Sequence, residues 1–462
     1  MRIVYGAVAQ PPLHRNYVPV ELNERTMETH YQKVMAAIQK SGLDALLIYA
    51  DREHGANFAY LTGYEPRFEE SLLVLHKNGD RYVLLGNENL KMARHSFLEA
   101  RVIHVPHFSL PYQPMLPDHT MEELMHAAGI TDNMKIGCAG WKLFTSRNEK
   151  NEELIDLPAF ILDAVRACNP NGRVVNACSI FIDPQNGVRI TVNANELAHY
   201  EFGSGMASGL VLDALNSVEP GKTEMEIAEK MNVKGQPITV TTICASGDRF
   251  ANAVVFPRNR EILAGDPFSI TLGLRGGLTS RAAYVAAGQE DLHVSETEYM
   301  KELVIPYFKT VVSWYEMVGL GVSCAEVYEM VREMLPPERY LWTLNPGHLT
   351  GQEEWMASPF FKDSCVTVKS GMMLQMDITP HLSGYTGISA EDGVAIADEN
   401  LREELRNTYP ETWKRIQNRK NYMKKILGIN LKEETLPLSD ICGYVRPMLL
   451  KKGQALQVLA EK

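Results

Sequence analysis

Asp377 is the side chain whose position most demands a chemical explanation. It lies between Met376 and Ile378, at the end of an apolar run that begins at Met372, a pattern typical of a buried strand. A buried carboxylate is costly unless a cation or a hydrogen-bond donor pairs with it. The sequence therefore predicts a partner for Asp377, in a purely structural pair or in a catalytic group.

His348 and Glu391 are two further side chains with acid–base chemistry in suggestive places. His348 ends a Pro-Gly-His segment, where a histidine can also be an ordinary loop residue. Glu391 opens Glu-Asp-Gly, which equally suits a turn before a strand. His104 and His107 have a His-x-x-His spacing, but they lie in a proline-containing strand and loop, which favours surface histidines.

An apolar and aromatic segment follows His348 closely. It contains Trp355, Met356, Phe360 and Phe361. Such residues usually belong to a core. Here they can also line a small pocket for a proline-like ring or, through cation–π contact, a quaternary ammonium.

Two sequence patterns must supply the elements that position these residues. From residue 24 to 182, a helix at 24–40, a buried strand at 44–50 and a hairpin predict an α/β domain with a mixed sheet; the hairpin strands are 71–75 and 82–85, around an Asn-Gly turn. From residue 183 to 400, the pattern predicts an α+β domain with an antiparallel sheet. Its expected helices are 194–217 and 296–334, and its expected strands are 239–244, 267–272, 372–376 and 393–397.

The two ends of the chain differ from both patterns. Residues 1–23 have few periodic apolar positions and predict an extended N-terminal arm. Residues 401–462 are charged and helical at first, which predicts a C-terminal extension packed on the second domain. The expected domains are therefore 24–182 and 183–400, flanked by these two segments.

Composition limits the class of partner and the compartment. The 462 residues carry a net charge of −11, which argues against nucleic acid or an anionic membrane as partner. No stretch reaches the roughly 18 apolar residues of a membrane span, and the start lacks the apolar core of a secretory signal. The seven cysteines form no Cys-x-x-Cys pair. We therefore expect a cytoplasmic protein with reduced, mostly buried thiols.

Several short motifs together resemble the creatinase/aminopeptidase P/prolidase superfamily, peptidase family M24. They are NFAYLTGY at 57–64, VEPGKTE at 218–224, GD at 265–266, NPGH at 345–348, SGM at 370–372 and AEDG at 390–393. The resemblance spans residues 25–400 in the family's order. It implies a C-terminal pita-bread catalytic domain preceded by a creatinase-like N-terminal domain, and a homodimer in which a neighbouring subunit caps the site.

The resemblance also implies two divalent metals held by Asp, Asp, His, Glu and Glu. Here Thr271 occupies the first Asp position, the second should fall near residues 280–282, and no carboxylate occurs from Pro267 to Gln289. His348 matches the histidine, Glu391 matches the last Glu, and Asp377 stands where a Glu is expected. We therefore expect no dinuclear centre and no cofactor. The alternative is a single Mn, Co or Zn ion on the three remaining residues.

Two other family features are also changed. The loop at 252–257 has no histidine before its proline, although metal-free creatinase relies on one there. Trp355 stands at or beside the position of the family's second active-site histidine. Arg281 lies within the segment that lacks acids, so we expect it to pair with Asp377 or Glu391 in place of the lost cations.

The resemblance and these changes favour a hydrolase that cleaves a C–N bond in a small amide, dipeptide or guanidino-like compound. The expected catalytic residues are His348, Asp377 and Glu391, with His348 activating water, and the expected substrate-binding residues are Arg281, Trp355 and Asn345. One alternative is an Xaa-Pro dipeptidase or aminopeptidase that uses a single residual metal. Another is an inactive homologue that binds a small molecule.

Overall fold

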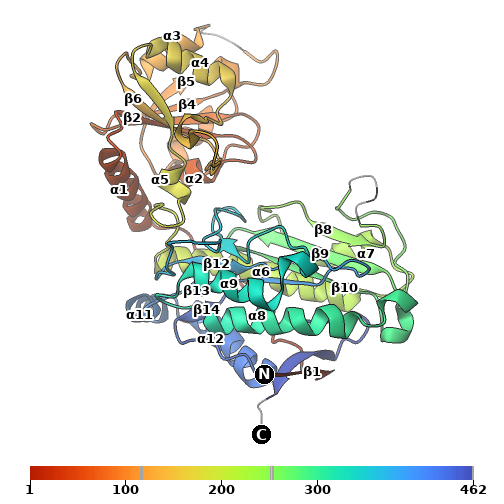
Figure 1. Ribbon diagram of the computed structural model, residues 1–462. Coiled ribbons are helices and arrows are strands. Elements are labelled where there is room, and N and C mark those ends of the chain that lie inside the picture. The colour runs from red at the N-terminus through yellow and green to blue at the C-terminus, as the bar shows by residue number, and fades with distance from the viewer. Residues whose placement is uncertain (115–117, 250, 252–253, 460–462) are drawn as a thin grey trace. The chain divides into compact units, whose positions relative to one another are not determined.

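The computed structural model describes residues 1–114, 118–249, 251 and 254–459 (Figure 1). The chain divides into two compact units. The N-terminal unit is Leu22–Ile190, and the C-terminal unit combines Met1–Glu21 with Thr191–Lys462. The N-terminal arm thus belongs to the same unit as the C-terminal extension.

A six-stranded mixed sheet forms the centre of the N-terminal unit, in the order β5-β4-β3-β2-β6-β7. Pairs β2–β3 and β3–β4 are antiparallel, whereas β4–β5, β2–β6 and β6–β7 are parallel, so the predicted mixed sheet is confirmed. The strands are β2 (Ala45–Ala50), β3 (Ser71–His76), β4 (Arg81–Leu85), β5 (Arg101–His104), β6 (Lys135–Ala139) and β7 (Arg173–Asn176).

The helices of this unit follow the sequence pattern where that pattern is strong. Helix α1 (Glu24–Lys40) has the predicted bounds, because the Asn23 side chain caps its start and Met27, Val34 and Ile38 form its buried stripe. The Asn-Gly turn between β3 and β4 closes at Gly79, whose φ of 94° suits glycine. The other helices are α2 (Ala56–Thr62), α3 (Met121–Ala127), α4 (Ala159–Cys168) and α5 (Ser179–Ile182), with 3-10 turns at Leu90–His95, Pro106–Phe108 and Asn151–Glu153.

The sheet of the C-terminal unit is antiparallel at every described pairing between its strands, in the order β11-β12-β13-β10-β9-β8 with β14 beside β13. Its strands are β8 (Ile243–Ser246), β9 (Pro267–Leu274), β10 (Gly277–Tyr284), β11 (His348–Leu349), β12 (Met373–Met376), β13 (Ser389–Ile396) and β14 (Thr435–Pro437). The strand predicted at 239–244 starts later, and β10 is a strand that the pattern analysis did not predict. The predicted antiparallel α+β architecture is confirmed.

Helix α6 (Ala194–Ser217) has the predicted bounds, but the helix predicted at 296–334 is interrupted. A π-helical turn at Met300–Val304 leads into α8 (Ile305–Met317), and α9 (Cys324–Met334) starts after a break. The break occurs because Gly321 adopts a φ of 75° and the Ser323 side chain caps a new helix. The remaining helices are α7 (Glu224–Ala228), α10 (Pro337–Tyr340), α11 (Glu399–Thr408) and α12 (Pro410–Tyr422), with a 3-10 turn at Glu229–Met231 and a π turn at Met423–Leu427; further 3-10 turns lie at Gln289–Asp291 and Val294–Glu296.

The two ends of the chain meet on the C-terminal unit. Strand β1 (Arg2–Ala7) pairs antiparallel with β15 (Gln454–Leu459). Nearby, the buried carboxylate of Asp440 accepts hydrogen bonds from Tyr17 Oη at 3.0 Å and from Arg419 Nε at 2.7 Å. The N-terminal arm and the C-terminal extension are therefore tied together by a strand pair and by buried polar contacts.

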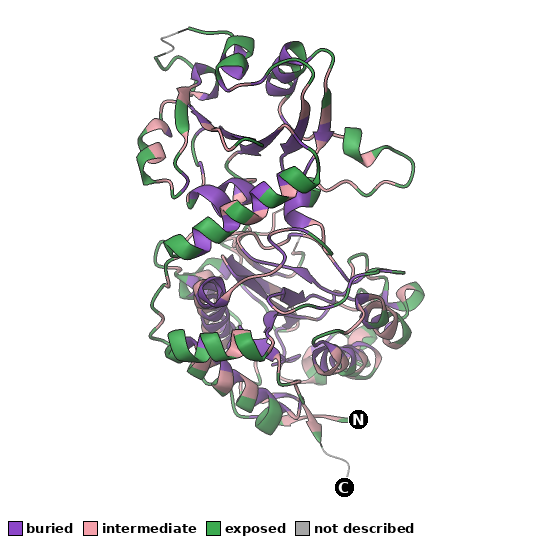
Figure 2. Cartoon of the chain, turned by 90° about the vertical axis from the view of Figure 1, so that its left-hand side faces the viewer, coloured by how far each residue is buried: buried purple, intermediate pink, exposed green. Residues whose placement is uncertain are grey.

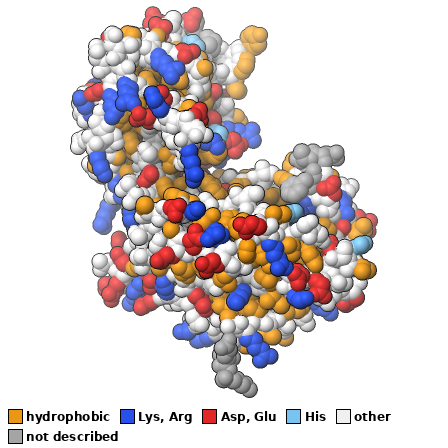
Figure 3. All heavy atoms as spheres, viewed as in Figure 1, with side chains coloured by type: hydrophobic (Ala, Val, Ile, Leu, Met, Phe, Trp, Pro, Cys, Tyr) orange, Lys and Arg blue, Asp and Glu red, His pale blue; other side chains and the backbone are white. Residues whose placement is uncertain are grey.

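The distribution of burial and charge agrees with the composition. Figure 2 shows buried strands in both sheets and helices that keep an exposed face. Basic and acidic side chains are intermixed over the face shown in Figure 3. All seven cysteines are free and six of them are buried, as predicted. Among the described helices, none is long and apolar enough to cross a membrane.

Candidate active site

The loop before β11 fixes the position of His348. Gly347 has a φ of 116°, and a Cβ atom there would lie 2.5 Å from the Gln375 carbonyl oxygen, so only glycine fits. The indole Nε1 of Trp314 donates a hydrogen bond of 2.9 Å to the Pro346 carbonyl. These constraints place His348 at the start of β11, where its side chain is fully buried.

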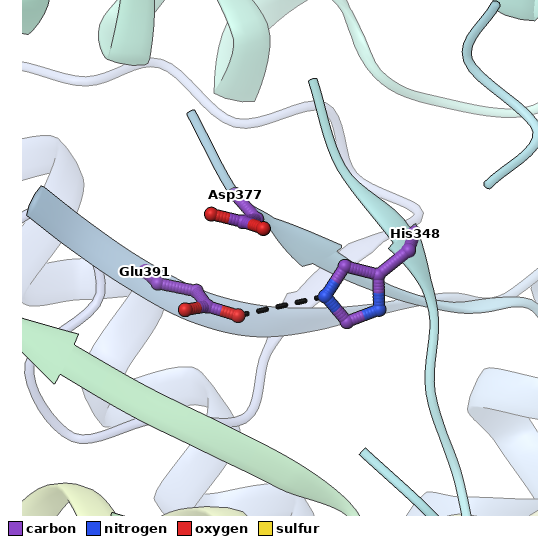
Figure 4. Close-up of side chains that lie close together, drawn as sticks. All are labelled: His348, Asp377 and Glu391. Carbon is purple, nitrogen blue, oxygen red and sulfur yellow. Dashed lines mark ion pairs between the residues drawn. The ribbon is translucent and has the colours of Figure 1, made fainter. Parts of the chain in front are cut away.

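Strand register brings Asp377 and Glu391 to the same face of the sheet as His348. His348 pairs with Gln375, and Gln375 pairs with Gly393. Side chains alternate along a strand, so Asp377, two residues beyond Gln375, and Glu391, two residues before Gly393, share that face. Figure 4 shows the three side chains turned toward one another, and one ligand atom from each lies within 4.8 Å of the others.

Burial and mutual charge shift the pKa values of this group. Burial would lower the pKa of His348, but the carboxylates of Glu354 and Glu391 outweigh it and raise that pKa to about 10. Burial raises the pKa of Asp377 to about 6, although His348 lowers it. Burial, followed by the charge of Asp377, raises the pKa of Glu391 well above its usual value. One cation thus faces more carboxylates than it can neutralise.

Glu354 is the member of this group that the sequence did not predict. The segment after β11 folds back on it, because Leu349 N donates to Ala357 O at 2.8 Å and Met356 N donates to Leu349 O at 3.0 Å. This return brings Glu354 Oε1 to 3.2 Å from His348 Nε2. Acidic residues in a polar turn give no sequence signal for such a contact.

The acid-free strands β9 and β10 carry hydroxyl groups beside this cluster. Thr271 and Ser280 are register partners, and Thr271 Oγ1 lies 2.9 Å from Ser280 Oγ in a hydrogen bond. Ser280 also pairs with Glu391 across the strands, so its side chain belongs to the same face. Two hydroxyls that satisfy each other bring no negative charge and no bridging carboxylate. This donor set does not fit a pair of divalent metals.

A single divalent cation does fit the remaining residues. His348 Nδ1 lies 3.2 Å from the Leu349 carbonyl, which can only accept, so Nδ1 donates and the other ring nitrogen is available as a ligand. That nitrogen, Nε2, is buried and has no hydrogen-bond partner among the described atoms. One imidazole with the carboxylates of Asp377 and Glu391 is a donor set suited to Mn, Co or Zn.

The predicted pairing of Arg281 with Asp377 or Glu391 is wrong. Arg281 Nη2 instead donates to Asp392 Oδ2 at 2.7 Å, and its other donors bind backbone carbonyls that include those of Tyr444 and Ile441. The reason is strand alternation, because Arg281 is the register partner of Ala390 and therefore lies on the opposite face from Glu391. Its side chain is buried on that face and contacts Glu391 at the backbone carbonyl, to which Nη1 donates at 3.1 Å.

The other predicted residues fall in distinct places. The rings of Trp355 and His348 are stacked, with centroids 4.0 Å apart and an interplanar angle of 25°. Asn345 is half-buried in the loop before β11, and its carbonyl accepts from Gly347 N at 2.7 Å. In the N-terminal unit, His104 Nε2 lies 2.6 Å from Asn87 Oδ1. Substrate binding by Trp355 and Asn345 stays a prediction, and residues 252–253 of the loop without histidine lie outside the described residues.

Comparison with protein families matches most of the chain in two blocks. Residues 31–168 match the Creatinase/Prolidase N-terminal domain, and residues 204–399 match Metallopeptidase family M24. The two blocks lie in the N-terminal and C-terminal units, respectively. A search among curated proteins gives no significant match.

Solved structures share the fold at low sequence identity. A recombinant prolidase from Thermococcus sibiricus superposes with a TM-score of 0.63 at 17% identity, over 82% of this chain and 96% of that one. The prolidase from Pyrococcus horikoshii OT3 gives 0.60 at 18% identity, over 80% and 95%. A putative aminopeptidase P from Bacillus anthracis gives 0.57 at 13% identity, over 88% and 99%. At these identities the likeness establishes the fold.

Proposed function

The chain belongs to the M24 metallopeptidase superfamily, with a creatinase/prolidase N-terminal domain, and from this premise we propose that it hydrolyses a C–N bond in a small substrate without a dinuclear metal centre. The observation that carries the proposal is the buried group of His348, Asp377 and Glu391, whose ligand atoms lie within 4.8 Å of one another. The substrate class is an amide, a dipeptide or a guanidino-like compound.

The pKa values favour proton-transfer roles other than those expected from the sequence. His348, with a pKa raised to about 10, is an imidazolium near neutral pH in the absence of a cation, and it then holds the carboxylates rather than activating water. Asp377, with a pKa raised to about 6, can accept a proton from water near neutral pH. Glu391, whose pKa burial raises further, can keep a proton to give to a leaving nitrogen.

A second candidate is an Xaa-Pro dipeptidase that uses one divalent cation. It is favoured by the buried Nε2 of His348, which has no described hydrogen-bond partner and faces two carboxylates. A bound cation would polarise the substrate carbonyl and lower the pKa of a water molecule. Trp355, stacked on His348, would offer an aromatic surface to a proline ring. The homodimer that the family likeness implies remains a prediction, which light scattering after gel filtration can check.

The test is an amine- and ammonia-release assay on the full chain, with and without added Mn²⁺. The substrates are Xaa-Pro dipeptides, small amides and guanidino compounds. We expect turnover of at least one class and a loss of at least about 100-fold in His348→Ala. His119→Ala is the matched control, because His119 is exposed in the N-terminal unit. Stabilising binding without turnover would contradict the proposal and favour a binding protein, and full activity in His348→Ala would refute the site.

A further inference from the structure

The carboxylates of Glu354 and Glu391 both approach the Nε2 atom of His348. Glu354 Oε1 lies 3.2 Å from Nε2, and Glu391 Oε1 lies 3.5 Å from the same atom. Both oxygens are close enough for ion pairs, yet Nε2 has no hydrogen-bond partner among the described atoms. The oxygens therefore flank the nitrogen without lying along its N–H direction.

These two distances match the spacing of neighbouring ligands around a common cation. With metal–ligand distances of about 2.1 Å, two neighbouring ligand atoms lie about 3.0 Å apart in an octahedron and about 3.4 Å apart in a tetrahedron. The two oxygens that flank Nε2 are at such distances. In a metal site the nitrogen lone pair points to the metal, so neighbouring oxygens lie to the side of that direction, as they do here.

Charge leads to the same conclusion. Glu354, Asp377 and Glu391 are close enough to influence one another, since the charge of Glu354 acts on both of the other carboxylates. Asp377 and Glu391 are buried, and the Glu354 side chain is only 20% exposed. Three carboxylates around one imidazole leave a negative excess in a place with little water, which a divalent cation would neutralise.

We propose that Glu354 is a ligand of a single divalent cation, together with His348, Asp377 and Glu391. The proposal rests on the second candidate function above and adds to it a carboxylate from the turn after β11. Three carboxylates and one imidazole form a hard, oxygen-rich set that suits Mn²⁺. In this site Glu354 makes up part of the charge that Thr271 and Ser280 do not supply.

The experiment is a titration of the metal-free full chain with Mn²⁺, followed by the electron paramagnetic resonance signal of free Mn²⁺. We expect one Mn²⁺ per chain for the wild type and an affinity at least about tenfold weaker for Glu354→Gln. Glu353→Gln removes the same charge one residue away and should bind as the wild type does. Unfolding of each variant in EDTA shows whether it folds, and the isosteric glutamine keeps the test usable because Glu354 is partly exposed.

The outcomes separate this proposal from the proposed function. Absence of Mn²⁺ binding in the wild type, two ions per chain, equal affinity in Glu354→Gln, or an equal loss in Glu353→Gln would each overturn the role of Glu354. Turnover by a wild type that binds no Mn²⁺ would leave the hydrolase proposal standing. Binding that depends on Glu354, with no turnover of any substrate, would support the cation site and contradict the hydrolase.

Discussion

Glu391 and Asp392 are neighbours in β13, and burial raises the pKa of both carboxylates, yet the two faces of the sheet give them different partners. Asp392 is fully buried and accepts hydrogen bonds from Arg281 Nη2 at 2.7 Å and from Ser439 Oγ at 2.6 Å. Glu391 faces His348 at 3.5 Å, together with the carboxylates of Glu354 and Asp377. One face is balanced in charge, and the other has a surplus of acid.

This difference between the two faces suggests which group of polar side chains stabilises the fold and which binds a ligand. A carboxylate whose partners satisfy it can be buried at small net cost. A group of acids around one imidazole raises the free energy of the folded chain, and such strain persists where a ligand relieves it. We therefore propose that the Arg281–Asp392 pair serves stability and that the His348 face serves binding.

Loss of the pair on the balanced face should have the largest effect on stability. Arg281→Met leaves Asp392 buried with hydrogen bonds from Ser439 and from the Gly443 backbone but without a cation, and we expect the free energy of unfolding to fall by about 3–4 kcal/mol. Urea denaturation followed by circular dichroism measures the change.

The double variant Arg281→Met/Asp392→Asn is the control for this prediction. It removes the charge as well as its partner, so it should recover part of the loss. A loss of less than about 1 kcal/mol of unfolding free energy in Arg281→Met would contradict the assignment of the Arg281–Asp392 pair to stability.

Strong local patterns let the sequence predict much of this fold. Helices α1 and α6 have their predicted bounds because capping residues and apolar stripes agree there. The helical region predicted at 296–334 is interrupted between α8 and α9, because Gly321 adopts a positive φ and the Ser323 side chain caps a new helix. Strand β10 was missed because its small and polar residues lack a clear alternation.

The sequence predicted those residues of the candidate site that lie in family motifs, taken in the family's order. Family motifs led to His348, Asp377 and Glu391, and the structure brings these side chains together. The face on which Arg281 lies depends on the register of β10, because a shift of one residue moves a side chain to the other face. Strand β10 is buried on both faces, so its sequence has no apolar and polar alternation that would specify this register. Glu354 contacts His348 because the segment after β11 folds back on the strand. No spacing of residues in the sequence predicts such a contact.

Asp377→Asn should stabilise the folded chain, whereas substitutions of Arg281 or Asp392 on the balanced face should destabilise it. The pKa of Asp377 is about 6 in the folded chain and near 3.8 unfolded, so between these values the folded chain holds a proton that the unfolded chain has lost. Wild-type stability therefore falls as pH rises from about 4 to about 6. The asparagine variant removes this penalty and should be more stable at pH 7 by roughly 3 kcal/mol when metal is chelated.

Urea denaturation in EDTA at pH 4.5 and pH 7 measures this difference. Asp392→Asn is the matched control on the other face, and it should lose stability at pH 7 because Arg281 then lacks its carboxylate. If Asp377→Asn lost as much unfolding free energy as Asp392→Asn, both acids would be structural, and the surplus of negative charge would not destabilise the folded chain.

Substitution of Trp355 should have the smallest of these effects, and it tests how the side chains on the two faces are held in place. Arg281 is held by hydrogen bonds from all three of its guanidinium nitrogens, so its orientation does not depend on stacking. His348 has a single described hydrogen bond, from Nδ1, and relies on the Trp355 ring 4.0 Å away. Trp355→Ala should therefore cost about 1 kcal/mol in stability and weaken Mn²⁺ binding a few-fold, whereas Trp355→Phe keeps most of both. Parallel urea and Mn²⁺ titrations measure the two effects. If Trp355→Ala lost stability but bound Mn²⁺ like the wild type, Trp355 would be a wall of the pocket and the imidazole would be oriented by its strand alone.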